Sequence, residues 1–410
     1  MSIRRIVLPI LAAALAAALM AQAALAAGPY QITGTSETRD HGIVRTEYTV
    51  KAGAHPLDRF KMIRVARSGS ADQFRGTIVF LPPLGTTFSF YEQRDPNGAL
   101  GSSIAEYFAQ RNFDVYGYSP RYEGIPAGTC EAGVLDCSIM GTWDMASQVD
   151  DISFIRSQIE ILHPGTRIVT GGASLGGILA LAVANAHPND WDGIIPWEGM
   201  LYSKNPQVRS INQGYCTTLE AQLAAGLVYD GVGTNVFKTA NELSRTTPGG
   251  LTPIPLFPPN LTNHQTLVAI LSVPTPGPAT MPAPNYVLMT GSVAEDRLFN
   301  ASEARIYDDV ARFVSYVPLP LVRDVSCSLA GVENQFTANL GNFHGAVLAI
   351  GGGHGFGPYM ADQLAQIGST DKTFRLEPAF GHIDHFMTPQ HRKFVEEPIF
   401  RWALRVFGGQ

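Results

Sequence analysis

The sequence predicts an α/β fold with a mostly parallel central sheet and helices on both of its faces. From Phe74 onward, short apolar runs typical of buried strands alternate with longer segments of helical periodicity, as in parallel strands joined by helices. The alternation stops at about Leu201 and resumes near residue 343. The chain has 410 residues, 45% of them hydrophobic, which exceeds one compact α/β unit and indicates a core with an insertion.

Residues 1–26 have the pattern of a signal peptide. Arg4 and Arg5 precede an apolar stretch, and Ala24-Leu25-Ala26 fits a signal peptidase site. We therefore expect a mature chain that starts near Ala27 and is secreted or periplasmic, with a retained membrane anchor as the alternative. No later segment is apolar for long enough to span a membrane, so no integral membrane segment is expected once the signal peptide is removed.

Acidic residues outnumber basic ones along the chain. The formal net charge is −6, and loss of Arg4 and Arg5 with the signal peptide makes it −8. This balance disfavours nucleic acids and anionic membrane surfaces as electrostatic partners.

The chain has four cysteines, an even set that favours two disulfides in an exported protein. Cys130 and Cys137 are the nearest pair, which would leave Cys216 with Cys327, although three pairings are formally possible. Zinc binding is the competing interpretation. It lacks support, because the sequence has no Cys-x2-Cys pair and no histidine cluster at ligand spacing, and no metal is expected.

Residues 27–73 are expected to form an N-terminal extension with one strand, in which Val44, Thr46, Tyr48 and Val50 alternate. Residues 74–200 form the first part of the predicted core. Its predicted helix over 145–162 has apolar residues every three or four positions and ends before Pro164-Gly165. Its predicted strands are the apolar runs at 77–81, 113–118, 167–170 and 193–197.

Residues 201–342 are expected to form an inserted cap. Pro-rich stretches at 253–259 and 274–284 interrupt it, and 286–289 is a hydrophobic segment of its own. Strand and helix signals then resume over 343–410, the second part of the core. They predict strands at 346–350 and 373–376, a helix over 359–367, and a C-terminal helix that opens at Thr388-Pro389 and is broken or restarted at Pro398.

Ser174 is the candidate catalytic nucleophile. It lies in Gly172-Ala173-Ser174-Leu175-Gly176, after a β-branched run and before the helix-forming run 178–184. A serine on such a strand-turn-helix has strained backbone geometry that exposes its hydroxyl, and the flanking glycines leave room where a Cβ would collide with neighbouring elements. The strand before this serine and the helix after it support a nucleophile more strongly than the five-residue pattern itself.

Taken together, these features resemble the α/β-hydrolase family. The resemblance covers residues 74–200 and 343–410 and depends on an early strand with an oxyanion loop, the serine turn, an insertion after the next strand and Gly381-His382 near the end. It implies the α/β-hydrolase fold, with the cap inserted after the strand that follows the nucleophile.

His382 is the candidate general base, because it lies on the loop after the last predicted strand, where the family places its histidine. A neutral imidazole suits this role because its pKa lies near working pH. His385 is the nearest rival, and His354 could line the pocket.

The acid departs from the commoner family pattern, in which it follows the strand before the histidine strand. Here that loop is the glycine-rich run 351–357, with no carboxylate before Asp362. Some haloalkane dehalogenases instead carry the acid after the strand that follows the nucleophile, and Glu198 occupies that place. The resemblance to those enzymes stops at the nucleophile, which there is a carboxylate. Glu198 is therefore the candidate acid; the alternatives are Asp384, Asp362, Glu295 and Asp296.

An oxyanion hole needs two backbone N–H donors. Leu175, directly after the nucleophile, is expected to supply the first. In Leu81-Pro82-Pro83-Leu84-Gly85 neither proline has an N–H, so Leu84 is the expected second donor and Gly85 the alternative. Phe88, Phe90 and Tyr91, next to this loop, could line an acyl pocket or belong to the core.

These residues predict a secreted serine hydrolase of the esterase or lipase kind, which cleaves small-molecule or polymeric carboxylic esters through an acyl-enzyme. No cofactor is expected, because the sequence has no phosphate loop or dinucleotide site. The same groups could cleave a carbon-carbon bond, as in β-diketone hydrolases, or an amide, as in aminopeptidases. A non-catalytic binding protein that keeps the fold is the remaining alternative.

Overall fold

The structure is a computed structural model that describes residues 30–69, 74–272, 287 and 298–408. The predicted signal peptide, the second Pro-rich stretch and most of the hydrophobic segment 286–289 lie outside the described residues. Among the described residues, no helix is both long and apolar enough to cross a membrane.

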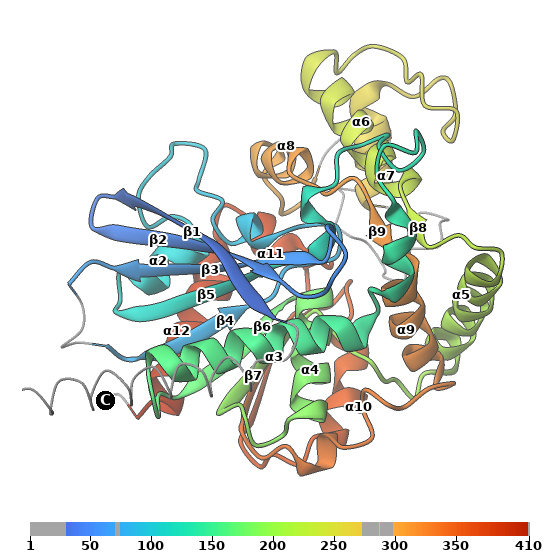
Figure 1. Cartoon of the computed structure of the whole chain (residues 1–410). Coiled ribbons are helices and arrows are strands. Elements are labelled where there is room, and N and C mark those ends of the chain that lie inside the picture. Colours follow the sequence, from blue (N-terminus) through green and yellow to red (C-terminus); the bar gives the residue numbers. More distant parts are fainter. Residues whose placement is uncertain (1–29, 70–73, 273–286, 288–297, 409–410) are drawn as a thin grey trace, which may run out of the picture.

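The described residues form one large nine-stranded sheet with the order β1-β2-β3-β5-β4-β6-β7-β10-β11. From β5 to β11 in this order, neighbouring strands run parallel. The predicted mostly parallel sheet is thus confirmed (Figure 1). The parallel strands are β4 (Gly76–Phe80), β5 (Phe113–Ser119), β6 (Ile168–Ala173), β7 (Gly193–Trp197), β10 (Ala346–Gly352) and β11 (Lys372–Glu377).

Three antiparallel strands precede the parallel part of the sheet: β1 (Gln31–Asp40), β2 (Ile43–Lys51) and β3 (Arg59–Arg67). The third pairs antiparallel with β5. The sequence predicts one strand in this segment and a core that begins at Phe74. The strand β1 could not be predicted, because almost every side chain of this edge strand is exposed and its sequence has no apolar alternation.

Helices cover both faces of the sheet (Figure 1). On one face, α3 (Met145–Leu162), α4 (Leu175–Ala186) and α10 (Gly357–Gln366) pack in a core that includes Val79 and Ile194. On the other face, α2 (Ile104–Ala109) and α12 (Glu397–Val406) pack against the alternate strand residues, including Ile78 and Ile195. This alternation along fully buried strands explains why they are continuous apolar runs.

Between β7 and β10 the described residues add helices but no strand to the main sheet. Two short strands in this region pair only with each other. Cys216–Cys327 joins two of the helices, and Cys130–Cys137 closes a loop after β5, so both predicted pairings are present. The elements are α5 (Pro206–Ala224), β8 (Tyr229–Asp230), α6 (Val232–Thr246), α7 (Asn263–Ser272), α8 (Glu303–Ala311), β9 (Val317–Pro318) and α9 (Leu319–Ala330).

The C-terminal helix begins later than predicted. A short helix, α11 (Asp384–Met387), precedes Thr388, and a π-helical turn over Arg392–Glu396 leads directly into α12. The chain is not broken at Pro398. The π-helical turn ends directly before α12 begins, and Pro398 lies in the first turn of α12, where it has no N–H to continue the preceding hydrogen bonds. Short 3₁₀ turns lie at Phe88–Phe90, Arg121–Gly124, Cys137–Thr142 and Leu340–Asn342.

Candidate active site

Ser174 lies on the sharp turn between β6 and α4. Its φ of 56° and ψ of −119° are unusual for a residue with a side chain, and only 7% of the residue is exposed. Two glycines make this turn possible. A Cβ on Gly172 would lie 2.0 Å from the carbonyl oxygen of Leu81, and a Cβ on Gly176 would lie 1.9 Å from the same atom. The predicted strand-turn-helix is therefore present, with its glycines packed against the end of β4.

The backbone of Ser174 contacts the segment that follows β7. The Ser174 N–H donates to the carbonyl oxygen of Trp197 at 2.8 Å. Gly199 is close as well, since a Cβ there would lie 2.8 Å from the carbonyl oxygen of Ser174. Glu198 is the residue between these two contacts, so its backbone is held beside the serine turn.

Glu198 is fully buried and has a positive φ of 49°. Its N–H donates to the Ile350 carbonyl oxygen at 2.8 Å, which ties it to β10. Its Oε2 atom lies 2.9 Å from Nδ1 of His382 and accepts the Phe356 N–H at 2.8 Å. Its Oε1 atom accepts the Gly352 N–H. Two backbone amides and an imidazole thus replace the water that a buried carboxylate loses.

The glycine-rich loop after β10 surrounds this carboxylate. A Cβ on Gly355 would lie 2.2 Å from Oε2 of Glu198, and a Cβ on Gly352 would lie 2.5 Å from the carbonyl oxygen of Phe380. The loop therefore has room for Glu198 only because these positions lack side chains. The absence of an acid from this run is visible in the sequence, but the packing of its glycines around Glu198 was not predicted. The run of glycines directly after a buried strand was the available signal.

His382 is 2% exposed and lies between β11 and α11. Its ring packs edge-on against the ring of Phe356, with 4.9 Å between the ring centres. Asp384 holds the loop around it, because its Oδ2 atom accepts the Gly381 N–H at 2.7 Å and an N–H of the Asn300 amide at 3.2 Å. The imidazole is thus oriented by Glu198, Phe356 and a tightly bonded loop.

The other predicted candidates have different surroundings. His385 is fully buried, and burial lowers its pKa to about 3. Asp384 binds the backbone of its own loop, as described above. Asp362 accepts the Lys204 N–H at 2.7 Å and the Ser203 hydroxyl. His354 is exposed. Glu295 and Asp296 lie outside the described residues.

The expected oxyanion loop lies against the first turn of α4. The Leu81 N–H donates to the Gly171 carbonyl oxygen at 2.9 Å, and the chain then leaves the sheet. Leu84 is partly buried, and Gly85 has a positive φ of 79°. The Gly85 carbonyl oxygen accepts the Val314 N–H at 2.8 Å, so the segment between β7 and β10 contacts this loop directly.

The aromatic residues beside this loop are all buried. Phe88 and Tyr91 are fully inaccessible and Phe90 is 2% exposed. The ring of Phe90 stacks on that of Phe386, with 3.8 Å between the ring centres. A Cβ on Gly117 would collide with the ring of Phe88. These contacts place the three aromatic residues in the core.

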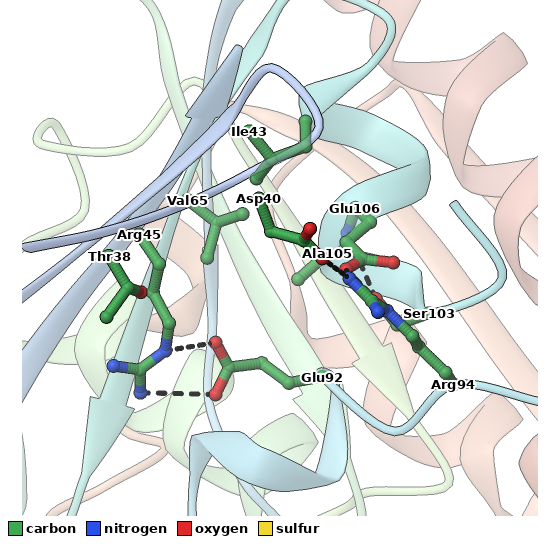
Figure 2. A pocket seen from close by; sticks show the side chains of 10 residues that line it. All are labelled: Thr38, Asp40, Ile43, Arg45, Val65, Glu92, Arg94, Ser103, Ala105 and Glu106. Atoms are coloured by element: carbon green, nitrogen blue, oxygen red, sulfur yellow. Dashed lines mark hydrogen bonds and ion pairs between the residues drawn. The ribbon is translucent and has the colours of Figure 1, made fainter. Parts of the chain in front are cut away.

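A separate cavity of about 190 Å³ lies beside β2 and β3 and is not lined by any of the candidate catalytic residues. Figure 2 shows that its charged side chains face one another: Arg45 binds Glu92, and Arg94 binds both Asp40 and Glu106. Because these charges are already paired, the cavity offers no free charged group to a ligand.

One group of possible metal ligands occurs among the described residues, formed by Cys216, Glu220 and Cys327. The two cysteines are joined in a disulfide. Their sulfur atoms are therefore not thiolate ligands.

No protein-family model and no curated protein sequence matches this chain. Solved structures do resemble it. A lipase candidate from Sulfolobus solfataricus is 17% identical, with a TM-score of 0.62, over 91% of this chain and 99% of the other. A monoglyceride lipase from Saccharomyces cerevisiae is 13% identical, with a TM-score of 0.49, over 92% of this chain and 96% of the other. The first of these likenesses shows that the chain has the predicted α/β-hydrolase fold. At 17% identity the likeness extends to the fold alone.

Proposed function

We propose that this chain, which has the α/β-hydrolase fold, is a serine hydrolase that cleaves carboxylic esters through an acyl-enzyme. Ser174 is the nucleophile, His382 the general base and Glu198 the acid that orients it. The observation that carries this proposal is the 2.9 Å contact between Nδ1 of His382 and Oε2 of Glu198. Glu198 directly follows Trp197, whose carbonyl oxygen accepts the Ser174 N–H at 2.8 Å.

The contact with Glu198 favours the tautomer of the His382 imidazole that the proposed mechanism needs. With the carboxylate accepting a proton from Nδ1, the opposite ring nitrogen, Nε2, is left unprotonated and can accept the proton of the Ser174 hydroxyl. The Ser174 oxygen then attacks the ester carbonyl. Glu198 stabilises the imidazolium that forms, and its two backbone amide contacts keep it in place.

The tetrahedral intermediate carries a negative oxygen, for which we propose the backbone N–H groups of Leu175 and Leu84 as donors, with Gly85 as the alternative to Leu84. His382 next gives its proton to the leaving alcohol, and the acyl group stays on Ser174. Water, deprotonated by the same ring, attacks the acyl-enzyme and releases the carboxylic acid.

His382 is favoured over His385 for two reasons. Of these two histidines, His382 is the one that contacts a buried carboxylate among the described residues, and this carboxylate stabilises its charged form. His385 is surrounded by Phe380, Trp197 and other buried groups, and its pKa of about 3 makes it a weak base at neutral pH. Glu198 is favoured over Asp384 because its Oε2 atom lies 2.9 Å from Nδ1 of His382, whereas the contacts described for Asp384 are with the Gly381 N–H and the Asn300 amide.

We further propose that the protein acts outside the cytoplasm, in the periplasm or the medium. The signal-peptide pattern of residues 1–26 supports this location. The two disulfides are compatible with it, because disulfides persist in oxidising compartments.

The test is a panel of p-nitrophenyl esters, β-diketones and aminoacyl anilides, run beside a fluorophosphonate probe on the native protein and on Ser174→Ala. We expect hydrolysis of short esters and labelling of the native protein, both lost in the variant. If the protein hydrolyses only the diketones, or only the anilides, it is a carbon-carbon hydrolase or an amide hydrolase and not an esterase. No labelling and no turnover, with an active control esterase, would indicate a binding protein.

A further inference from the structure

The hydroxyl of Tyr91 bridges the two chain segments that carry the proposed oxyanion donors. It donates to the carbonyl oxygen of Leu81 at 2.7 Å and accepts the N–H of Ala173 at 3.0 Å. Leu81 leads through two prolines into Leu84, and Ala173 leads through Ser174 into Leu175. A single side-chain oxygen therefore connects the starts of both segments.

This bridge takes the place of a missing hydrogen bond in the sheet. β4 and β6 pair in parallel up to Phe80 and Gly171, and the Leu81 N–H still donates to Gly171. In a regular parallel ladder, the next hydrogen bond would join the Ala173 N–H to the Leu81 carbonyl oxygen. Here both groups bind the Tyr91 hydroxyl instead. The Tyr91 hydroxyl therefore joins the two strands where the serine turn and the oxyanion loop begin.

The surroundings hold the hydroxyl in this position. Tyr91 is fully buried, its ring stacks on that of Phe80 with 4.9 Å between the ring centres, and its carbonyl oxygen accepts the Ala105 N–H at 3.0 Å. Gly172 leaves space for it, since a Cβ there would lie 2.6 Å from the hydroxyl oxygen. Burial raises the pKa of Tyr91, so the phenol stays protonated and remains a donor.

We propose that Tyr91 is a positioning residue that sets the spacing between the two halves of the oxyanion hole by replacing one hydrogen bond of the sheet. This proposal rests on the proposed ester hydrolysis at Ser174. Tyr91 does not touch the substrate. It acts through Leu81 and Ala173, so its removal affects the transition state, in which the oxyanion exists, more than substrate binding.

Tyr91→Phe tests the proposal, and Tyr116→Phe is its matched control. Tyr116 is also fully buried, on β5, but its hydroxyl has no hydrogen-bond partner among the described residues. Turnover of a p-nitrophenyl ester is measured per site labelled by a fluorophosphonate, together with the affinity for an arylboronic acid that forms a tetrahedral adduct. For Tyr91→Phe we expect a fall in kcat of roughly 10- to 100-fold, a KM within about twofold, and a boronate affinity weakened in parallel with kcat. Tyr116→Phe should keep native values.

A further variant with 4-aminophenylalanine at position 91 restores a donor toward Leu81. Partial recovery of kcat and of boronate affinity is expected. If Tyr91→Phe does not fold, the kcat and boronate affinity of the amine variant are compared with those of the native protein instead. Native kcat and boronate affinity in Tyr91→Phe, or no recovery with the amine, would overturn the proposal while leaving ester hydrolysis intact. A native protein that neither reacts with the probe nor hydrolyses esters would instead remove the proposed function, and this inference with it.

Discussion

Gly355 lies so close to Glu198 that a Cβ at position 355 would come within 2.2 Å of the carboxylate oxygen Oε2. The same oxygen contacts Nδ1 of His382 and the N–H of Phe356. The loop after β10 supplies amide donors and empty space, and the carboxylate reaches it from the end of β7. The Glu198 carboxylate can occupy its position only because this loop has glycine at the residues beside it.

Replacing Gly355 with alanine is expected to displace the Glu198 carboxylate and with it the His382 ring. We expect kcat/KM for an ester to fall roughly 10- to 100-fold and the free energy of unfolding to fall by about 1–3 kcal/mol from overpacking. Ester kinetics and denaturant unfolding provide the measurements. Gly214→Ala, on the exposed face of α5 with no atom within 4 Å of the added Cβ, is the control and should keep native activity. Native kinetics in Gly355→Ala would mean that the carboxylate is not held as described.

Removing the charge of Glu198 tests its proposed role directly. In Glu198→Gln, an amide replaces a carboxylate that binds the imidazole and two backbone N–H groups. The imidazolium loses its stabilising charge, and the amide N–H₂ clashes with donors already pointing at it. We expect kcat to fall by a factor on the order of hundreds or more. Asp362→Asn, which alters a carboxylate bonded to Lys204 and Ser203, should leave kcat unchanged. Near-normal turnover of Glu198→Gln would assign the acid to another residue.

The proposed pairing of Glu198 with His382 could be predicted because both residues follow strands of the parallel part of the sheet. The carboxyl ends of such strands meet at one edge, and buried apolar runs such as 193–197 identify the strands in the sequence. Likewise, α3 has the predicted bounds because its periodicity continues unbroken up to Pro164-Gly165.

Other features could not be predicted, because they depend on neighbours distant in sequence. Tyr91 has the sequence signature of a core aromatic residue, and its bridging role exists only because β4 and β6 separate after Leu81. The glycines of 351–357 similarly acquire their function from a carboxylate more than a hundred residues away, as the Gly352–Glu198 contact shows. The strand β1 is too exposed for hydrophobic alternation to indicate it.

The segment that leads into α8 contacts the loop that carries His382. The Asn300 amide donates to the Ala379 carbonyl oxygen at 2.7 Å and to Oδ2 of Asp384 at 3.2 Å. The N–H of Ser302 donates to the Met387 carbonyl oxygen at 2.8 Å. This part of the chain between β7 and β10 is therefore hydrogen-bonded to the loop that carries His382, the proposed base, and to the short helix α11 that follows it.

Asn300→Asp is expected to weaken this contact, because a carboxylate cannot donate either hydrogen bond and would face the carboxylate of Asp384. We expect the free energy of unfolding to fall by about 1–3 kcal/mol at pH 7, and kcat to fall as well. Both effects should be smaller near pH 4, where the new carboxyl group is partly protonated. Thermal unfolding and ester kinetics at the two pH values are the measurements. Asn260→Asp, at an exposed position, is the control. Equal loss of stability in both variants would show that the contact with Asp384 is unimportant.

Asp309, on the buried face of α8, should make the stability of the protein depend on pH. Burial raises its pKa from 3.8 to about 7; the nearby Asp308 adds to the rise, while Arg312 and Arg305 oppose it. At a pH between these two pKa values, Asp309 is ionised in the unfolded chain but still protonated in the folded chain. The free energy of unfolding therefore falls as pH rises from about 4 to 7. The loss reaches a magnitude on the order of 4 kcal/mol and is complete above the folded pKa.

The neutral variant Asp309→Asn removes this titration. Its free energy of unfolding should exceed that of the native protein at pH 8. The difference should shrink as pH falls toward 4, because the folded native side chain is then protonated and the unfolded one, with its pKa of 3.8, is partly protonated as well. Denaturant unfolding at several pH values measures it. Asp308→Asn changes the adjacent carboxylate, whose side chain is 45% exposed and paired with Arg312, and should leave the pH dependence nearly native. A difference between Asp309→Asn and the native protein that is constant from pH 4 to 8 would show that Asp309 ionises normally in the folded chain.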